Sequence, residues 1–178
     1  MNDESSLLVA LTSGDPEGVQ ILIDRVGATT AITWLRSWLF AGDALRPGLR
    51  SAVTACLVKI GASSIPVFVE AIKLGETVVG NFGIRDTARG ALVSIGGLDA
   101  LPSLVGILVD NDAEARCAAA DTFCAMEFPL FTFSDPTVPQ RSLKILALIA
   151  ASASPNNREI VERRIEDFKQ RLRDQGWR

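Results

Sequence analysis

The chain has 178 residues, of which 48% are hydrophobic and 22% are charged, and its formal net charge is −3. This composition excludes a disordered chain, and the length allows either one domain with a sizeable core or a short array of repeats. The acidic balance argues against a nucleic-acid binder, which usually carries a basic excess. The sequence contains no histidine, so Ser-His-Asp and Cys-His catalysis are excluded and the commonest zinc ligand is missing.

The first residues, MNDESSLLVALTSGD, include acidic side chains where a secretory signal peptide is basic. We therefore expect no signal peptide and a cytoplasmic location. An odd number of cysteines without a secretory signal also predicts reduced thiols. The three cysteines are Cys56, Cys117 and Cys124.

Helix signals begin close to the N-terminus. Residues 5–12 predict a short opening helix, and Asp15-Pro16 predicts the N-cap and the first residue of a second helix. Apolar periodicity then predicts helices over residues 31–40, 49–60, 65–74, 84–95, 100–109 and 115–126. No sustained alternation with a period of two competes with these helices, so we expect an all-α protein.

Three glycines divide this series of helices at regular intervals. Gly27, Gly61 and Gly96 each follow an apolar run, and they lie 34 and 35 residues apart. Glycine just past a helix end closes the last turn in a left-handed conformation at little steric cost. We expect each of these glycines to end a helix, with a positive φ angle at Gly61 and Gly96.

One weakly charged stretch, residues 91–109, is long enough to suggest a membrane span. Gly96-Gly97, Asp99 and Pro102 interrupt it, and each half has helical periodicity of its own. We therefore expect two buried helices joined by a turn.

Aligned arginines give the repeat its register. Arg50, Arg85 and Arg116 each begin a helix whose apolar positions recur at matching offsets. Two helix types alternate with a period of about 31 to 35 residues, which is the range of repeats that stack as helix pairs. The sequence therefore predicts a right-handed α-solenoid of about five helix pairs, forming one domain over residues 1–178.

The C-terminal third of the chain departs from the repeat. Residues 127–139, EFPLFTFSDPTVP, predict an irregular connection that holds Phe128, Phe131 and Phe133. These aromatic side chains either cover the last helix pair or form an exposed anchor for a partner. A terminal amphipathic helix is predicted over residues 157–174, in a mildly basic end of the chain.

The segments LVDNDAEARCAAADTF (residues 108–123) and IRDTARGALVSIGGLDALPSLVGIL (residues 84–108) resemble HEAT repeats, in particular the short repeats first noted in phycobilin lyases. The resemblance covers about residues 30–126. It implies that Arg50, Arg85 and Arg116, with Asp110 or Asp112, form a ladder between neighbouring repeats. The alternative is that these guanidinium groups bind phosphate or carboxylate.

The resemblance also implies that the second helix of each pair lines a concave surface. Positions one, five and eight residues after each arginine fall on the outward face of these helices. We call them the small-residue strip, because most are small and few are charged. The alternative, a helical phase shifted by one position, would bury them. They are Ser51, Ala55, Val58, Asp86, Gly90, Val93, Cys117, Asp121 and Cys124.

Three members of the strip have side chains that bind metals in other proteins. Cys117, Asp121 and Cys124 are spaced so that they share one helix face. No C-x-x-C pair and no histidine accompany them, so we expect no metal and no other cofactor. No clearly basic side chain is adjacent to either cysteine, which argues against a reactive thiol.

The sequence holds no convergent set of titratable groups, so no catalytic residue is assigned. We expect a non-catalytic interaction or scaffold module that binds another protein on the small-residue strip, and no membrane partner. One alternative, implied by the resemblance alone, is a phycobilin lyase-type protein in which Asp121 and Cys124 assist bilin attachment. A second alternative is nucleic-acid binding through the terminal helix.

Overall fold

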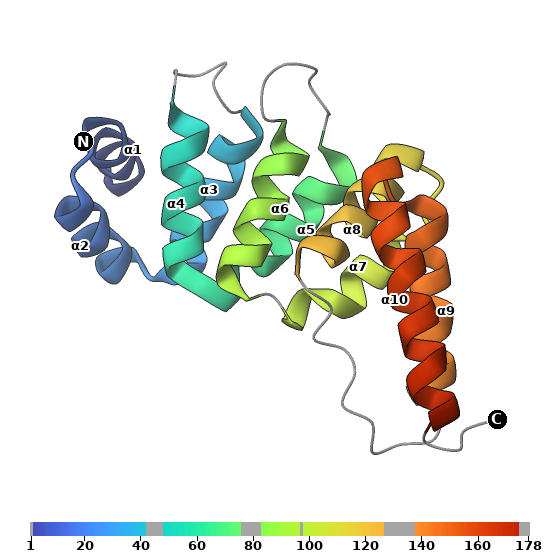
Figure 1. The fold of residues 1–178 in the computed structure, drawn as a ribbon. Coiled ribbons are helices and arrows are strands. Elements are labelled where there is room, and N and C mark those ends of the chain that lie inside the picture. The colour runs from blue at the N-terminus through green and yellow to red at the C-terminus, as the bar shows by residue number, and fades with distance from the viewer. Residues whose placement is uncertain (1, 42–47, 76–82, 97, 127–137, 175–178) are drawn as a thin grey trace.

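The computed structural model describes residues 2–41, 48–75, 83–96, 98–126 and 138–174, and every element in these ranges is helical. No strand occurs in this part of the chain. The prediction of an all-α protein is therefore confirmed for the described residues (Figure 1). In chain order the α-helices are α1 (Asp3–Ser13), α2 (Pro16–Val26), α3 (Ala28–Ala41), α4 (Leu49–Ile60), α5 (Ile65–Leu74), α6 (Ile84–Ile95), α7 (Leu101–Ile107), α8 (Ala113–Ala125), α9 (Val138–Ser152) and α10 (Pro155–Asp174).

Consecutive helices pack as pairs: α1 with α2, α3 with α4, α5 with α6, α7 with α8, and α9 with α10. Neighbouring pairs meet mainly through α4, α6 and α8, which pack side by side, and α8 also contacts both α9 and α10 (Figure 1). Buried apolar side chains form one core cluster that extends from Leu7 in α1 to Leu172 in α10. The core therefore runs along the whole series of pairs, and each pair covers the apolar side of the next.

Three predicted helices agree with the structure to the residue, and the others differ at one or both ends. The segments 49–60, 65–74 and 84–95 coincide with α4, α5 and α6. The segment 100–109 is instead split between the 3-10 turn η3 (Leu98–Ala100) and the short α7. Helix α9 begins at Val138, so the last two residues of the predicted connection 127–139 are helical. Proline is tolerated there because the first turn of a helix leaves its N–H groups unpaired.

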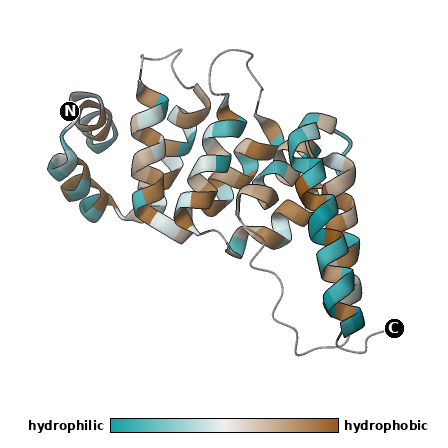
Figure 2. Ribbon diagram, in the orientation of Figure 1, coloured by the Kyte–Doolittle hydropathy of each residue, from teal (hydrophilic) through white to brown (hydrophobic). Residues whose placement is uncertain are grey.

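The remainder of that predicted connection, with Phe128, Phe131 and Phe133, lies outside the described residues. The terminal helix is confirmed as α10, which begins two residues earlier than predicted. Figure 2 shows that α10 is hydrophilic over most of its surface, and its buried side chains are Val161, Phe168 and Leu172.

The glycine prediction is confirmed. The φ angles of Gly27, Gly61 and Gly96 are 84°, 83° and 72°. The N–H groups of Gly61 and Gly96 bond carbonyl groups in the last turns of α4 and α6, which satisfies acceptors that a helix end otherwise leaves open.

Replacing Gly96 by valine is expected to lower the free energy of unfolding by about 1–2 kcal/mol, because a side chain disfavours the left-handed conformation. An added Cβ would meet no atom within 4 Å, so the loss reflects backbone conformation alone. Urea denaturation followed by circular dichroism measures it. Gly90→Ala is the control, since Gly90 lies inside α6 with equally open space and alanine is the better helix former by ~1 kcal/mol. Equal stability of Gly96→Val and the unchanged protein would contradict the cap assignment.

The apolar segments are parts of the helical core. Within the weakly charged stretch 91–109, the structure contains the end of α6 and the separate α7, as expected. The 26-residue segment Leu49–Leu74 contains an 18-residue window with a mean hydropathy of 1.8, so by length and composition alone it is a candidate membrane span. In the structure it is interrupted by the 3-10 turn η2 (Gly61–Ser64), and its helices α4 and α5 pack on α3, α6 and α8. A buried core helix passes the same hydropathy test, so the membrane evidence is weak.

Candidate functional site

The small-residue strip lies on the surface of the three helices α4, α6 and α8, which pack side by side. Ser51, Ala55, Gly90 and Val93 are exposed, and the other five members are half-buried. Val93 keeps 39% of its surface accessible, which is high for a large apolar side chain. The alternative helical phase, in which these positions enter the core, is therefore excluded.

Gly90 has open space around it. A Cβ added there would meet no atom of the described residues within 4 Å, apart from the backbone of its own helix. Close packing inside the protein therefore does not explain why a glycine stands in the middle of α6. By contrast, a Cβ added at Gly75 would lie 2.2 Å from the Ile84 side chain, so that glycine is required by the approach of α6 to the end of α5.

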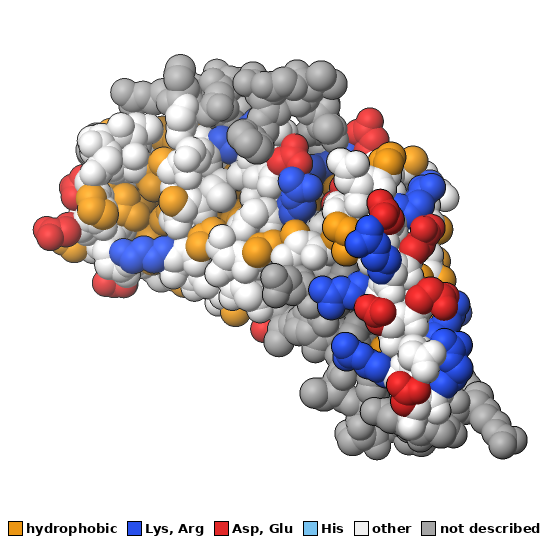
Figure 3. Space-filling view, viewed as in Figure 1, with side chains coloured by type: hydrophobic (Ala, Val, Ile, Leu, Met, Phe, Trp, Pro, Cys, Tyr) orange, Lys and Arg blue, Asp and Glu red, His pale blue; other side chains and the backbone are white. Residues whose placement is uncertain are grey.

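Charge is distributed unevenly over this side of the molecule. Figure 3 shows few charged side chains over α4 and α6 and a dense mixture of acidic and basic side chains over α10. A hollow of about 230 Å³ lies at the α8 end of the strip, lined in part by Asp86, Arg89, Cys117 and Asp121. Arg89 and Asp86 form an ion pair at 3.4 Å, so this end of the strip is polar.

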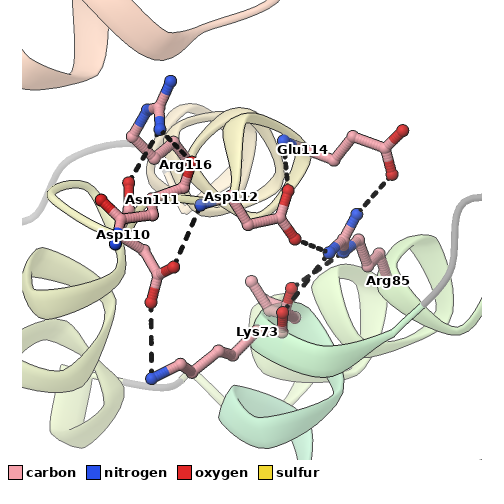
Figure 4. Close-up of polar contacts among 8 residues, drawn as sticks. Lys73, Arg85, Asp110, Asn111, Asp112, Glu114 and Arg116 are labelled. Carbon is pink, nitrogen blue, oxygen red and sulfur yellow. Dashed lines mark hydrogen bonds and ion pairs between the residues drawn. The ribbon is translucent and has the colours of Figure 1, made fainter.

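Arg85 is the centre of a polar network that joins adjacent helix pairs (Figure 4). Its side chain is only 6% exposed. Nη2 lies 2.6 Å from an oxygen of Asp112, and Nη1 lies 2.7 Å from Oε2 of Glu114. Nε donates to the carbonyl of Ile72 at 3.0 Å, near the C-terminus of α5. Arg85 therefore joins α5, α6 and the start of α8, which agrees with the predicted ladder and leaves its guanidinium occupied.

The other predicted members of the ladder behave differently. Arg116 donates to the carbonyls of Asp110 and Asn111, in the turn just before its own helix. Among the described contacts, Arg116 is held by the turn that precedes its own helix, and its bridging of neighbouring pairs stays a prediction. Asp110 instead pairs with Lys73 at 3.4 Å, which adds a second link between α5 and this turn. Arg50 is half-buried at the start of α4.

Another link between pairs was not anticipated from the sequence. Arg36 in α3 forms two hydrogen bonds with the carboxylate of Glu70 in α5, and Nε lies 2.6 Å from Oε2. The hydrogen bonds from Arg36 lower the pKa of Glu70. These residues are 34 positions apart, which equals the glycine spacing. Because the two residues are one repeat period apart, they occupy equivalent positions in neighbouring pairs, and this spacing could have predicted their contact from the sequence.

Asp121 connects α8 to the start of α10. Its Oδ1 accepts hydrogen bonds from the backbone N–H and the hydroxyl of Ser154, both at 3.1 Å, and from Nδ2 of Asn157 at 2.8 Å. These donors belong to the turn and first residues of the final helix. The carboxylate therefore positions the last helix pair, a role that the sequence did not suggest.

The two strip cysteines are poor nucleophiles. Burial, and then the nearby Asp121 carboxylate, raise the pKa of Cys124 to about 11. The same two causes raise the pKa of Cys117, whose Sγ lies 4.0 Å from Asp121 Oδ2. Both thiols are therefore protonated near neutral pH. Within the described part of the chain, no group of three or more Cys, Asp or Glu side chains is placed to hold a metal ion.

Comparison of the chain with models of protein families, with curated proteins and with solved structures finds no match.

Proposed function

We propose that this chain is a HEAT-like α-solenoid that binds another protein through the small-residue strip. The proposal rests on the accessibility of the strip over α4, α6 and α8, together with its low charge. A helix face that is merely solvated usually carries charged side chains, as α10 does in Figure 3. A surface of small residues instead allows the backbone of a partner to approach closely.

The observation that carries the proposal is the open Gly90. Glycine inside a helix lowers stability by ~1 kcal/mol relative to alanine. No contact within the described protein requires it, so close approach by a second molecule is the physical reason that remains. Val93, one turn further along α6, supplies an exposed apolar contact beside it.

The solenoid part of the proposal is supported by three repeated features. Helix pairs follow one another through α1 to α10, and the second helices α4, α6 and α8 pack in series. Glycines with positive φ end α2, α4 and α6. Links such as Arg36–Glu70 and Arg85–Asp112 connect elements of neighbouring pairs, which suits an architecture in which each unit is stabilised by the next.

The two alternative functions gain no support from the side chains on which they depend. A lyase-type role assigned Asp121 and Cys124, but Oδ1 of Asp121 already accepts three hydrogen bonds and the Cys124 thiol has a pKa of about 11. Nucleic-acid binding relied on basic side chains of α10. Arg163 and Lys169 of that helix form ion pairs with Glu159 and Glu166, which lowers the positive charge available to a phosphate backbone.

The double change Gly90→Arg and Val93→Glu is expected to abolish partner binding while the protein stays folded. Both positions are exposed, so the new charges remain in water and need no buried partner. The tagged protein and its variants are used for affinity capture from cells that express the chain, with quantitative mass spectrometry. A specific partner should be recovered by the unchanged protein and lost from the double variant.

Gly90→Ala tests the close approach itself. It adds one methyl group in space that the described protein leaves open, so it is expected to raise the thermal midpoint and to weaken partner recovery, because the methyl group lies where the partner approaches. Circular dichroism of the double variant checks that helical content is kept. Full recovery of the partner by a folded double variant would refute the strip as the binding surface.

A further inference from the structure

A second hollow lies at the other end of the molecule, between the α1–α2 pair and α4. Its volume is about 350 Å³, which falls within the range of ~300–1,000 Å³ typical of ligand pockets. The apolar part of its lining includes Leu11, Val19, Ala52, Ala55 and Cys56. Figure 3 shows hydrophobic side chains gathered on this part of the surface, between the α1–α2 end and α4.

The hollow exists because small side chains meet where α1 approaches α4. Ala10 in α1 and Ala52 and Ala55 in α4 are too short to fill the space between the two helices. Cys56 is only 6% exposed and lies behind them. Burial raises the pKa of its thiol to about 11, as expected for a sulfur atom in apolar surroundings. The hollow therefore offers an apolar interior rather than a polar crevice.

Two charged side chains line the hollow, Asp15 and Lys59, and only Asp15 has a hydrogen-bond partner within the described residues. The carboxylate of Asp15 accepts a hydrogen bond from the backbone N–H of Gly18 at 2.9 Å, so it is occupied as the N-cap of α2. The ammonium group of Lys59 is exposed near the end of α4, and no acidic side chain of the described residues forms an ion pair with it. The Asp15 carboxylate keeps its negative charge, which the N-terminus of α2 partly offsets, so Lys59 is the charged group of the lining that is left to attract an anion.

We propose that this hollow binds a small amphipathic anion, with its apolar chain between α1–α2 and α4 and its carboxylate on Lys59. The ligand class is a free carboxylic acid with a single medium-length hydrocarbon chain. Burial of the chain supplies most of the affinity, and Lys59 orients the head group. This site shares Ala55 with the small-residue strip, but Gly90 and Val93, the two strip positions changed in the partner experiment, lie on α6 and do not line it.

Octanoate is a suitable probe, because Cys56 reports on occupancy of the hollow. Alkylation of the three cysteines by N-ethylmaleimide at mildly alkaline pH is followed by peptide mass spectrometry with increasing octanoate. Octanoate is expected to slow alkylation of Cys56 several-fold and to leave Cys117, which lines the hollow between α6 and α8, unchanged. Hexanoate should need roughly fifteenfold higher concentrations, since two buried methylene groups are absent.

Isothermal titration calorimetry with variants then tests the two parts of the site. Lys59→Gln is expected to weaken octanoate binding by about two- to fivefold, as for an exposed ion pair, whereas the matched change Lys144→Gln on α9 should have no effect. Ala52→Leu should abolish binding by filling the hollow. The Gly90→Arg and Val93→Glu variant should bind octanoate as the unchanged protein does, which keeps this test independent of the partner surface.

Two kinds of result would overturn the proposal, one concerning the hollow and one concerning the charge. One is octanoate that leaves the alkylation rate of Cys56 unchanged at millimolar concentrations. The other is octylamine that binds as tightly as octanoate, or Lys59→Gln that binds octanoate as tightly as Lys144→Gln, because either result shows that the positive charge of Lys59 plays no part.

Discussion

Replacing Arg85 by alanine is expected to lower the free energy of unfolding by about 3 kcal/mol, the largest effect of any single change considered. The side chain is 6% exposed, and its truncation removes hydrogen bonds to Asp112, Glu114 and the carbonyl of Ile72. After the change, water can hydrate the carboxylates of Asp112 and Glu114, which are partly exposed. The expected loss of stability therefore lies at the lower end of the range for a broken buried ion pair. The carbonyl of Ile72 also loses the hydrogen bond that it accepts from Arg85. Urea denaturation followed by circular dichroism measures the loss.

Arg89→Ala is the matched control for this change. Arg89 lies one turn further along α6 and pairs with Asp86 at the surface, so its removal should lower stability by less than ~1 kcal/mol. If both alanine variants unfold at the same urea concentration, then the network around Arg85 does not stabilise the protein. A ligand-binding role for this guanidinium would then have to be considered again.

Replacing Asp121 by alanine is expected to lower the free energy of unfolding by about 2 kcal/mol, and to do so mainly at the C-terminal end. The carboxylate accepts three hydrogen bonds from Ser154 and Asn157. A hydrogen bond to a charged group typically contributes ~1.5–3 kcal/mol to stability. Hydrogen exchange measured by mass spectrometry should show faster exchange in α10 than in α4 or α5.

Asp121→Asn separates the geometry of this contact from its charge. The amide keeps an oxygen that can accept from Ser154, so this variant should recover part of the stability that alanine loses. Unchanged exchange in α10 for both variants would show that Asp121 does not position the final helix pair. It would also free this carboxylate for the chemical role that the lyase-type alternative assigned to it.

Helical periodicity was enough to predict which residues form the small-residue strip, but not the space around them. The nine positions of the strip were identified from a fixed offset after each aligned arginine; four of them are exposed and five are half-buried. The helical period alone is sufficient for this, because residues on one face recur every three or four positions whatever the helix packs against. The open space around Gly90 was not predictable, since it depends on where α4 and α8 lie relative to α6.

The sequence by itself determined the helices and most of their ends. Apolar periodicity defined α4, α5 and α6 to the residue, and Gly61 and Gly96 ended two of them, because glycine adopts positive φ at little cost within a local turn. The resemblance implied Asp112 as a partner of Arg85, and only the tertiary structure decided the bonds of Arg85 to Glu114 and the Ile72 carbonyl, the tether at Asp121 and the hollow beside Lys59. Each depends on residues between 13 and 49 positions apart. Such contacts are set by the packing of whole helices, which no local pattern encodes.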